Sequence, residues 1–316
     1  MSGWSLSQMP DQRGRTVVIT GANSGLGLRS AEALAGSGAR VLMACRNPDK
    51  GASALEAVTA KASGPAPELV SLDLSEPASI EAAAADITSR TDHVDVLMNN
   101  AGVMAIPLRR NSEGWELQFA TNHLGHFALT GRLLPALLAA EAPRVVTTSS
   151  QASRPGKVDF RDPQWERRRY SRWFAYSQSK FSNLLFAFEL ARRAEAAGSD
   201  LVSVAAHPGY AATHLQAVGP EMEGNKLMGR VMAATNRVMA QSDADGALPQ
   251  LYAATMPDVK PSEYFGPKGF GEQKGPPVRV RAKGSAYDEG TAKKLWDLSE
   301  ELTGVAYDFG GGASSA

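Results

Sequence analysis

Residues 20–27, which read Thr-Gly-Ala-Asn-Ser-Gly-Leu-Gly, constrain the fold of this chain more than any other segment. They follow a β-branched run at 16–20 and precede a helix-like segment at 28–36. Glycine permits a tight turn and lets the backbone approach a pyrophosphate, and the following helix offers free N–H groups at its N-terminus. This strand–turn–helix context predicts a phosphate-binding crossover at the start of a parallel sheet. A turn that only connects the two elements is the alternative interpretation.

Strands and helices are predicted to alternate along the rest of the chain. The strands fall at 40–44, 68–72, 94–98, 144–149 and 201–206, and the helices at 48–62, 77–90, 112–140, 173–197, 225–241, 243–254 and 288–303. The pattern of 112–140 leaves room for an interruption, and 261–275 reads as a glycine-rich loop. Short apolar strands that alternate with longer helices indicate an α/β fold, a doubly wound and mostly parallel Rossmann sheet with helices on both faces.

One domain is expected from the 316 residues, because no linker rich in Pro, Gly or Ser divides the chain. We predict an N-terminal extension at 1–14, a Rossmann-type domain at 15–305 and a disordered tail at 306–316. Within the domain, residues from about 214 to 285 are predicted to form a lid and loop elaboration that covers the substrate.

Composition excludes several classes of function. Lys+Arg and Asp+Glu number 33 each, so the chain lacks the overall positive charge of a nucleic-acid-binding protein. The single cysteine, Cys45, excludes an intrachain disulfide and a cysteine-based zinc site. His123 and His126 lack a third ligand at helical spacing, so we predict no metal site and assign both rings to packing. Without a signal-like N-terminus or an uncharged apolar run of about 18 residues, the protein is predicted to be cytoplasmic, with no membrane span.

A tyrosine and a lysine stand four residues apart at 176–180, which read Tyr-Ser-Gln-Ser-Lys. On the helix predicted at 173–197 they share one face. A free tyrosine titrates near about 10, so proton transfer near neutral pH requires a shift of about 3 units, or roughly 4 kcal/mol of preferential phenolate stabilisation. A nearby ammonium and an oxidised nicotinamide, both positive, can supply it. Taken alone, the spacing is more often that of a surface Tyr and Lys pair.

Four segments together resemble the short-chain dehydrogenase/reductase family, from residue 16 to about residue 213. They are the TGxxxGxG turn at 20–27, Asn-Asn-Ala-Gly at 99–102, the Tyr and Lys pair at 176–180, and His-Pro-Gly at 207–209. The resemblance implies an oxidoreductase that transfers a hydride between a nicotinamide cofactor and a carbonyl/alcohol pair of a small-molecule substrate.

The resemblance also implies a catalytic set of Asn122, Ser150, Tyr176 and Lys180. Tyr176 is expected to exchange the proton with the substrate, and Ser150 to polarise the substrate oxygen. Lys180 is expected to hold the nicotinamide ribose and, with Asn122, to relay protons to solvent. Ser149 is the alternative to Ser150, because both serines stand at the end of the same predicted strand.

Cofactor contacts are implied at Gly21, Asn23, Ser24, Leu26, Gly27, Arg46, Asp73, Leu74, Asn100, Ala101, Tyr176, Lys180 and Thr213. Cys45 occupies the place of the acid that would bind an NAD ribose, and Arg46 can bind a 2′-phosphate through its forked donors, so NADP(H) is favoured over NAD(H). Alternatively, Arg46 is a solvated loop residue, Asp73 caps the helix that follows Ser75, and Thr213 caps a later helix. Cys45 itself is interpreted as a small buried residue rather than a reactive thiol.

A long spacing and two short motifs point to one branch of the family. Ser150 and Tyr176 are 26 residues apart, which is longer than in many members and implies an insertion at 154–171 beside the site. This spacing, together with Ala-Cys-Arg-Asn at 44–47 and Asn-His-Leu-Gly-His-Phe at 122–127, is similar to the retinol dehydrogenase and protochlorophyllide reductase-like branch. That branch implies a lipophilic carbonyl or alcohol as substrate.

Other features leave alternatives open. The apolar and methionine side chains of 216–241 either contact a lipophilic substrate or pack in the core or against another subunit. The basic run at 166–173 either attracts an acidic substrate or membrane lipid, or forms a solvated helix face. Helices such as those at 112–140 and 173–197 pair subunits in many relatives, so the resemblance allows a homo-oligomer. A catalytically silent redox sensor that binds a dinucleotide, or a scaffold, is the alternative to an enzyme.

Overall fold

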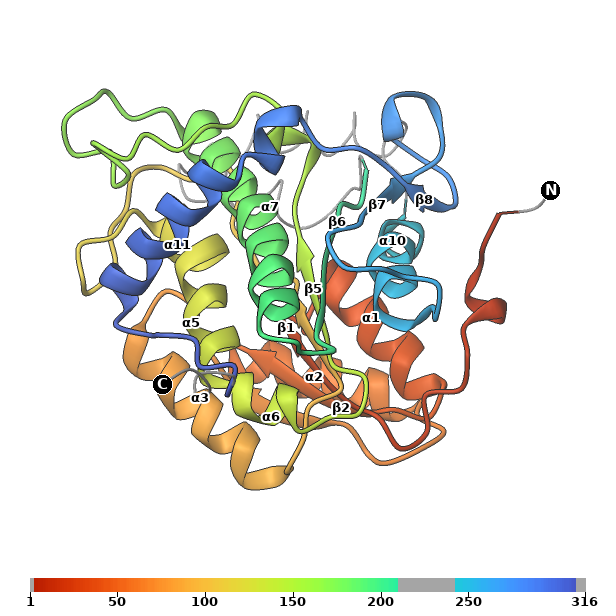
Figure 1. The fold of residues 1–316 in the computed structure, drawn as a ribbon. Helices are drawn as coiled ribbons and strands as arrows, with labels where there is room; N and C mark the ends of the chain where they lie inside the picture. The colour runs from red at the N-terminus through yellow and green to blue at the C-terminus, as the bar shows by residue number, and fades with distance from the viewer. Residues whose placement is uncertain (1–2, 210–241, 311–316) are drawn as a thin grey trace, which may run out of the picture.

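The structure, a computed structural model, describes residues 3–209 and 242–310. Its centre is one sheet of eight strands in the order β3-β2-β1-β4-β5-β6-β7-β8, parallel throughout except for β8 (Figure 1). The strands are β1 (Thr16–Thr20), β2 (Arg40–Cys45), β3 (Glu68–Ser71), β4 (Val96–Asn99), β5 (Arg144–Thr148), β6 (Val202–Ala206), β7 (Tyr264–Pro267) and β8 (Pro277–Arg279). The strand order reverses at β1, which lies between β2 and β4, so the predicted doubly wound Rossmann sheet is confirmed.

Helices cover both faces of the sheet (Figure 1). One face carries α1 (Gly25–Gly36), α2 (Pro48–Thr59) and α10 (Asp243–Thr255), and the other α3 (Pro77–Arg90), α5 (Gly125–Arg132) and α7 (Arg172–Ala196), with α11 (Glu289–Thr303) packed against α7. Successive residues of β1 supply both cores, because side chains of a strand alternate between its faces. Val17 and Ile19 pack under α1 and α10, whereas Val18 packs under α3 and α5.

Helix α7 is buried on nearly every side, although it carries many polar residues. It packs on β5 and β6, and α11 lies against it from outside. Tyr176 and Lys180, one helical turn apart on α7, therefore retain exposed fractions of only 5% and 3%. Polar groups buried in this way must find partners inside the protein or in a bound ligand.

The helix predicted over 112–140 is shorter and broken. It begins at α4 (Leu117–Phe119), because Asn111 first turns the chain by accepting the backbone N–H of Trp115 on its side-chain oxygen at 2.8 Å. A π-helical turn, Ala120–Leu124, then precedes α5. Pro135 has no N–H to donate, and the helix stops at Arg132 before a separate α6 (Leu134–Leu138). The prediction was wrong for residues 112–116 and right about an interruption.

The loop predicted at 261–275 is wrong in part, because β7 lies within it. β7 pairs in parallel with β6, and β8 returns antiparallel beside β7. Gly266 read as a loop residue, but its place in the strand requires glycine: a Cβ there would collide with the ring of His207 at the end of β6. The sequence of this short strand contains Gly and Pro, which are more typical of loops than of strands.

Both ends of the described chain pack on the domain. The indole Nε1 of Trp4 lies 3.2 Å from the sulfur of Met256, just after α10. The hydroxyl of Tyr307 donates to the backbone carbonyl of Phe127 at 2.6 Å, so the predicted disordered tail does not begin at residue 306. The end of that tail, 311–316, and the segment 216–241 lie outside the described residues.

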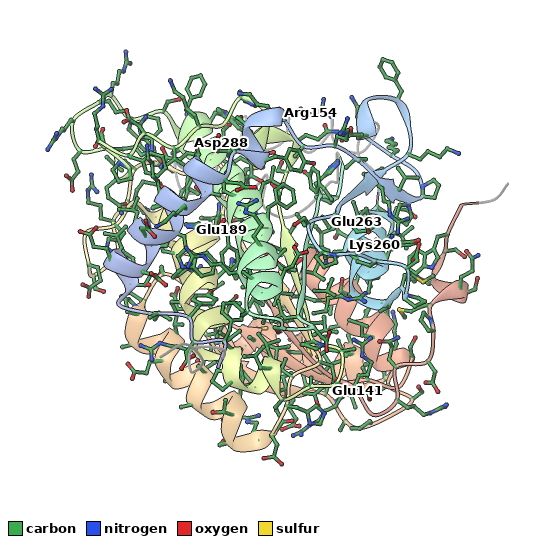
Figure 2. All side chains as sticks on the ribbon, in the orientation of Figure 1. Glu141, Arg154, Glu189, Lys260, Glu263 and Asp288 are labelled. Atoms are coloured by element: carbon green, nitrogen blue, oxygen red, sulfur yellow. The ribbon has the colours of Figure 1, made fainter. Side chains whose placement is uncertain are left out.

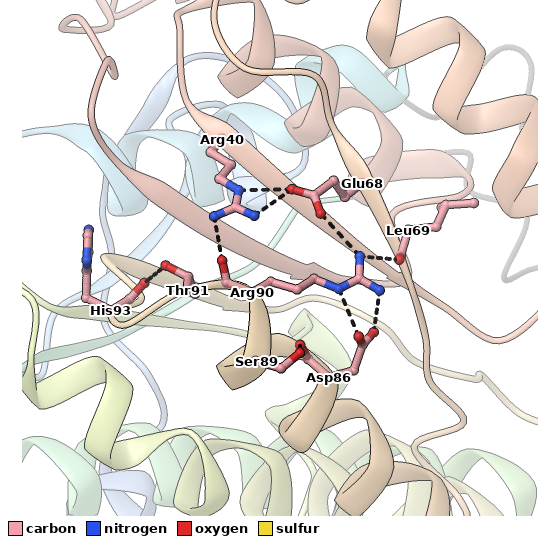
Figure 3. Close-up of polar contacts among 8 residues, drawn as sticks. All are labelled: Arg40, Glu68, Leu69, Asp86, Ser89, Arg90, Thr91 and His93. Atoms are coloured by element: carbon pink, nitrogen blue, oxygen red, sulfur yellow. Dashed lines mark hydrogen bonds and ion pairs between the residues drawn. The ribbon is translucent and has the colours of Figure 1, made fainter.

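A cluster of ion pairs fastens the edge of the sheet at the amino ends of β2 and β3 (Figure 3). The guanidinium of Arg40 donates to Glu68 from Nε at 2.9 Å and from Nη2 at 2.8 Å. Arg90, at the end of α3, reaches the same carboxylate at 3.3 Å and pairs with Asp86 at 2.7 Å. These contacts join two strands and a helix.

The opposite end of the sheet is the carboxyl end of its parallel strands. Glu141 precedes β5 and Arg154 follows it, and Figure 2 shows these two residues at opposite ends of the molecule. Ligands of open α/β sheets bind outside the carboxyl ends of the strands, at the switch point of the strand order. The end marked by Arg154 is therefore where a functional site is expected.

Candidate active site

The glycine-rich turn leads directly from β1 into α1. Gly21 has a φ of +67° and Gly25 a φ of +53°, a region in which side chains other than glycine are strained. A Cβ on Gly27 would collide with the carbonyl oxygen of Gly21, and one on Gly21 would lie 3.0 Å from the Cβ of Ala101. The side chain of Ser24, the N-cap residue of α1, makes no capping hydrogen bond. The backbone N–H groups in the first turn of α1 are thus not capped by Ser24, and they can donate hydrogen bonds to a phosphate.

The loop after β4 is tied to the end of β1. The hydroxyl oxygen of Thr20 accepts the backbone N–H groups of Asn100 at 2.9 Å and Ala101 at 3.0 Å. In return, the side-chain amide of Asn100 donates to the carbonyl of Thr20 at 2.8 Å. These contacts hold Asn100 and Ala101 against the phosphate turn, which fits a dinucleotide lying across both strand ends.

The end of β2 offers a neutral residue followed by a cation. Cys45 is buried, and burial raises the pKa of its thiol to about 11, partly offset by backbone hydrogen bonds from Ala22 and Asn23. This supports its interpretation as an unreactive buried residue. The side chain of Arg46 is 65% exposed, and its Nη1 lies 3.9 Å from Asp73 Oδ2. A partly solvated guanidinium in this position remains able to bind an anion.

Asp73 does not cap the helix after Ser75. The N-cap residue of α3 is Glu76, and Asp73 Oδ1 instead accepts the backbone N–H and the hydroxyl of Ser75 at 2.9 and 2.6 Å. Leu74 is buried, and its carbonyl lies so close to Gly125 of α5 that a Cβ there would collide with it. Asp73 and Leu74 are thus held rigidly between β3 and α5.

Tyr176 and Ser150 face each other at the carboxyl end of β5. Their side chains share a hydrogen bond, which lowers the pKa of the Tyr176 phenol, while burial raises it more strongly, to about 12. The expected lowering towards neutral pH is therefore absent from the chain alone, and a bound cation would have to supply it. Ser149 is turned elsewhere, since its hydroxyl donates to the backbone carbonyl of Lys180 at 2.8 Å. Of the two serines, Ser150 contacts the phenol.

The ammonium of Lys180 is buried and donates to the backbone carbonyl of Thr148 at 3.0 Å. Burial lowers the pKa of Lys180 to about 8, with no carboxylate among the causes of the shift. A Cβ placed on Gly102 would lie 3.4 Å from this nitrogen, so the loop after β4 approaches it closely. A buried cation with unused donors fits the hydroxyl groups of a bound ribose.

Asn122 occupies the π-helical turn before α5. Its side-chain oxygen accepts the N–H of Val103 at 2.8 Å, and its amide donates to the carbonyl of Val103 at 2.9 Å and to the hydroxyl of Ser179 at 2.8 Å. The π-helical turn aims the side chain at the loop after β4, and such turns are frequent at functional sites. The structure thus places Asn122, Ser150, Tyr176 and Lys180 around one end of α7.

His123 and His126 are completely buried on the same segment. His123 Nε2 lies 2.9 Å from the hydroxyl of Ser299, and His126 Nε2 lies 2.9 Å from that of Thr20. Burial lowers the pKa of His123 to about 3 and of His126 to about 4, so both rings are neutral at physiological pH. Within 3–209 and 242–310, no three His, Cys, Asp or Glu side chains group closely enough to hold a metal ion.

The insertion at 154–171 packs on the domain. The hydroxyl of Tyr170 donates to the buried carboxylate of Glu116 at 2.9 Å, and the Arg168 guanidinium lies 3.6 Å from the centre of the Trp165 ring. Burial raises the pKa of Glu116. The basic run at 166–173 lies mostly ahead of α7, so the predicted helix face is wrong for 166–171.

Sequence reasoning missed two residues near the site. Gln250 of α10 is 2% exposed and accepts the hydroxyl of Thr148 at 3.0 Å. Its signal was a polar side chain within the apolar stripe that Ala247, Leu251 and Ala254 form on α10. Trp173, in the first turn of α7, is half-exposed, and its ring centre lies 6.4 Å from that of Tyr176.

Thr213 and the methionine-rich segment at 216–241 lie outside the described residues. In the portion of the chain that the structure describes, none of the helices has the length and apolar character needed to span a membrane.

Known proteins resemble this chain over most of its length. A family model described as short chain dehydrogenase matches residues 15–224. Retinol dehydrogenase 14 of Mus musculus is 36% identical over 302 residues, which cover 92% of this chain and 86% of that protein. Retinol dehydrogenase 12 of the same species is 37% identical over 295 residues, with 93% and 88% covered. A crystal structure of an uncharacterised protein from Mycobacterium paratuberculosis superposes with a TM-score of 0.80 at 41% identity, covering 98% of this chain and all of that one. Because these matches extend over most of its length, the chain belongs to the short chain dehydrogenase family, on the retinol dehydrogenase-like branch, and is an NAD(P)-dependent dehydrogenase/reductase.

Proposed function

We propose that this protein transfers a hydride between NADP(H) and the carbonyl/alcohol pair of a lipophilic small molecule, with Tyr176 as the acid/base. One observation carries the proposal. The buried phenol of Tyr176 is hydrogen-bonded to Ser150 and stands one helical turn from the buried ammonium of Lys180. Such a pair of titratable groups, desolvated at the carboxyl end of the sheet, is suited to proton transfer.

The proposed chemistry separates hydride from proton. The dinucleotide, when bound, supplies the hydride for reduction of the carbonyl carbon or accepts it from the alcohol carbon. In reduction, Tyr176 donates its proton to the carbonyl oxygen and Ser150 steadies that oxygen with its hydroxyl. The ammonium of Lys180 favours the phenolate that remains. In oxidation the proton moves from the alcohol to Tyr176.

Asn122 supports this proton transfer by holding the end of α7. Its amide bonds to the hydroxyl of Ser179, which in turn donates to the backbone carbonyl of Tyr176 at 2.8 Å. Its side-chain oxygen lies 3.0 Å from the position of a Cβ on Gly102, the residue that also approaches Lys180. We assign to Asn122 and Lys180 the relay of protons between the phenol and solvent.

The preference for NADP(H) rests on the end of β2. An NAD-specific site needs a carboxylate there to bind the ribose 2′-hydroxyl, and the buried thiol of Cys45 offers none. The exposed guanidinium of Arg46 is free to turn towards a 2′-phosphate, since its contact with Asp73 is long, at 3.9 Å. Both features favour the phosphorylated cofactor.

A lipophilic substrate is supported by the surface beside the phenol. Trp173 is 51% exposed and meets the Tyr176 ring edge to face. An exposed indole next to the reacting group is suited to pack against an apolar substrate. The relatives are named retinol dehydrogenases, and retinol is a lipophilic alcohol.

A panel of aldehydes, ketones and alcohols, followed through NADPH absorbance, tests the proposal. We expect turnover of apolar aldehydes or ketones that exceeds turnover of small polar ones. NADPH binding by fluorescence is measured in parallel. Binding without turnover across the panel would favour a redox sensor, and absence of binding would favour a scaffold.

A further inference from the structure

A buried glutamine on α10 joins four elements that surround the proposed site. Gln250 Nε2 donates to the hydroxyl oxygen of Ser30 at 2.8 Å, to Asn100 Oδ1 at 3.2 Å and to the carbonyl of Leu26 at 3.4 Å. Its Oε1 accepts the hydroxyl of Thr148 at 3.0 Å. Figure 1 shows α10 beside α1 on one face of the sheet, so this amide lies between helix and strand ends.

The partners of Gln250 are themselves fixed. The amide of Asn100 donates to the carbonyl of Thr20, which turns its oxygen towards Gln250. Ser30 is fully buried on α1, and Thr148 is 5% exposed at the end of β5. Each contact therefore replaces hydration that the folded chain has removed, and a lost partner would leave a buried polar group unpaired.

Thr148 connects this amide to the lysine. Its hydroxyl is held by Gln250, and its backbone carbonyl accepts Lys180 Nζ and the side-chain amide of Asn183, both at 3.0 Å. The carbonyl is thus the partner that fixes the ammonium, and Gln250 fixes the residue that carries the carbonyl. Gln250 makes no hydrogen bond to the lysine itself, so its effect on Lys180 passes through Thr148.

We propose that Gln250 is a positioning residue: by bonding Thr148, Asn100 and the first turns of α1, it sets the place of the Lys180 ammonium relative to the phosphate turn. This inference rests on the proposed function, in which that ammonium holds the cofactor ribose and favours the phenolate. It adds a residue from a helix that carries none of the sequence motifs.

Substitution of Gln250 by leucine tests the inference. Gln250→Leu keeps the approximate volume and removes all four hydrogen bonds, so Thr148 loses the side-chain contact that fixes its place beside the ammonium. The matched control is Thr255→Val, on the same helix, which removes a buried hydroxyl whose hydrogen bond goes only to the carbonyl of Leu251 at 2.8 Å. Both variants lose one buried polar side chain of α10, and melting temperatures report their general cost.

Two readouts separate positioning from stability. The first is the pKa of the Lys180 amine in the cofactor-free protein, by NMR of isotopically labelled lysine assigned with Lys180→Met. The second is the NADPH dissociation constant. We expect Gln250→Leu to lower the lysine pKa by half a unit or more, and to raise the dissociation constant about tenfold, roughly 1.4 kcal/mol. Thr255→Val leaves both values as in the wild type.

A third variant restores the hydrogen bond to Thr148 and should shift the pKa of Lys180 in the other direction. Gln250→Glu keeps an acceptor for the Thr148 hydroxyl and, when ionised, adds a negative charge, so the lysine pKa should not fall below the wild-type value. Among the described residues, the other titratable groups near the ammonium are Tyr176 on α7 and His126 on α5, and all variants retain both. Equal lysine pKa values and equal NADPH affinities in Gln250→Leu and Thr255→Val would overturn the inference.

The test also separates this inference from the proposed function. If the wild-type protein binds no NADPH, the proposed function fails, whereas the lysine titration in the free chain still decides whether Gln250 sets the ammonium. If the wild-type protein binds NADPH but the pKa of Lys180 is the same in Gln250→Leu as in the wild type, the inference is overturned and the proposed function stands.

Discussion

The backbone carbonyl of Thr148 accepts a hydrogen bond from the ammonium of Lys180 at 3.0 Å, inside a region closed to solvent. A carbonyl is a weaker partner for a cation than a carboxylate, and burial therefore lowers the lysine pKa to about 8. This places the charge of Lys180 within reach of physiological pH. It also leaves the ammonium with hydrogen-bond donors for a ligand.

The kcat/KM for NADPH should fall as the pH rises through about 8, because Lys180 of the cofactor-free enzyme then loses its charge. A kcat/KM profile with NADPH measures this fall, since kcat/KM reports the pKa values of the free enzyme.

The free energy of unfolding should change in the opposite direction over the same pH range. The unfolded lysine binds its proton up to about 10.5, so the free energy of unfolding should increase between about pH 8 and 10.5. Lys180→Met should remove that increase, and a wild-type unfolding energy flat across this window would contradict the assigned burial.

Replacement of Arg46 should change the choice of cofactor. Arg46→Asp puts a carboxylate where the 2′-phosphate is expected, so NADPH affinity should fall tenfold or more, roughly 1.4 kcal/mol, while NADH affinity is retained or improved. Dissociation constants for both cofactors give the ratio. Arg13→Asp, at an exposed guanidinium before β1, serves as the charge-matched control. An unchanged NADPH to NADH ratio in Arg46→Asp would refute the role of Arg46.

Removal of Trp173 should weaken the binding of large apolar substrates selectively. We expect Trp173→Ala to raise KM for bulky apolar aldehydes about tenfold, because the indole surface beside Tyr176 is lost, with little change for small ones. Phe174→Ala removes the neighbouring exposed aromatic ring as a control. If both variants raise KM equally, or if neither does, Trp173 is not the surface that selects the substrate.

The ion-pair cluster at the amino ends of the strands should affect stability alone. Glu68→Gln weakens the contacts with Arg40 and Arg90, whose side chains are about a third exposed, so we expect a loss of about 1 kcal/mol or less in the free energy of unfolding. Glu81→Gln, at a longer and more exposed pair with Arg132, should change it less. Turnover should be the same in both, and a reduced kcat in Glu68→Gln would show that this edge communicates with the site.

Local sequence predicted the parts of the fold that local chemistry determines. The turn at 20–27 requires glycine because Gly21 has a positive φ and Gly27 leaves no room for a Cβ. The spacing of Tyr176 and Lys180 placed them on one face of a helix, and α7 has them there. Strands buried on both faces were visible as apolar runs.

Features that depend on distant contacts could not be read in this way. Residue 266 of β7 must be glycine because the ring of His207 occupies the space of a Cβ, and nothing near residue 266 in the sequence shows this. Gln250 sits 102 residues from Thr148, so only the fold reveals their hydrogen bond. The burial that raises the pKa of the Tyr176 phenol in the chain alone also depends on distant contacts, and the spacing of Tyr176 and Lys180 does not show it.

The central claim is that the Tyr176 phenol carries the proton, and Tyr176→Phe tests it most directly. Turnover and NADPH binding are measured together, with Tyr252→Phe as control, since the hydroxyl of Tyr252, in the last turn of α10, bonds to Asp258 in the loop that follows this helix. We predict that Tyr176→Phe lowers kcat by roughly 10²- to 10⁴-fold, the range for loss of a general acid, with NADPH affinity unchanged within about threefold. Wild-type kcat in Tyr176→Phe would contradict the account.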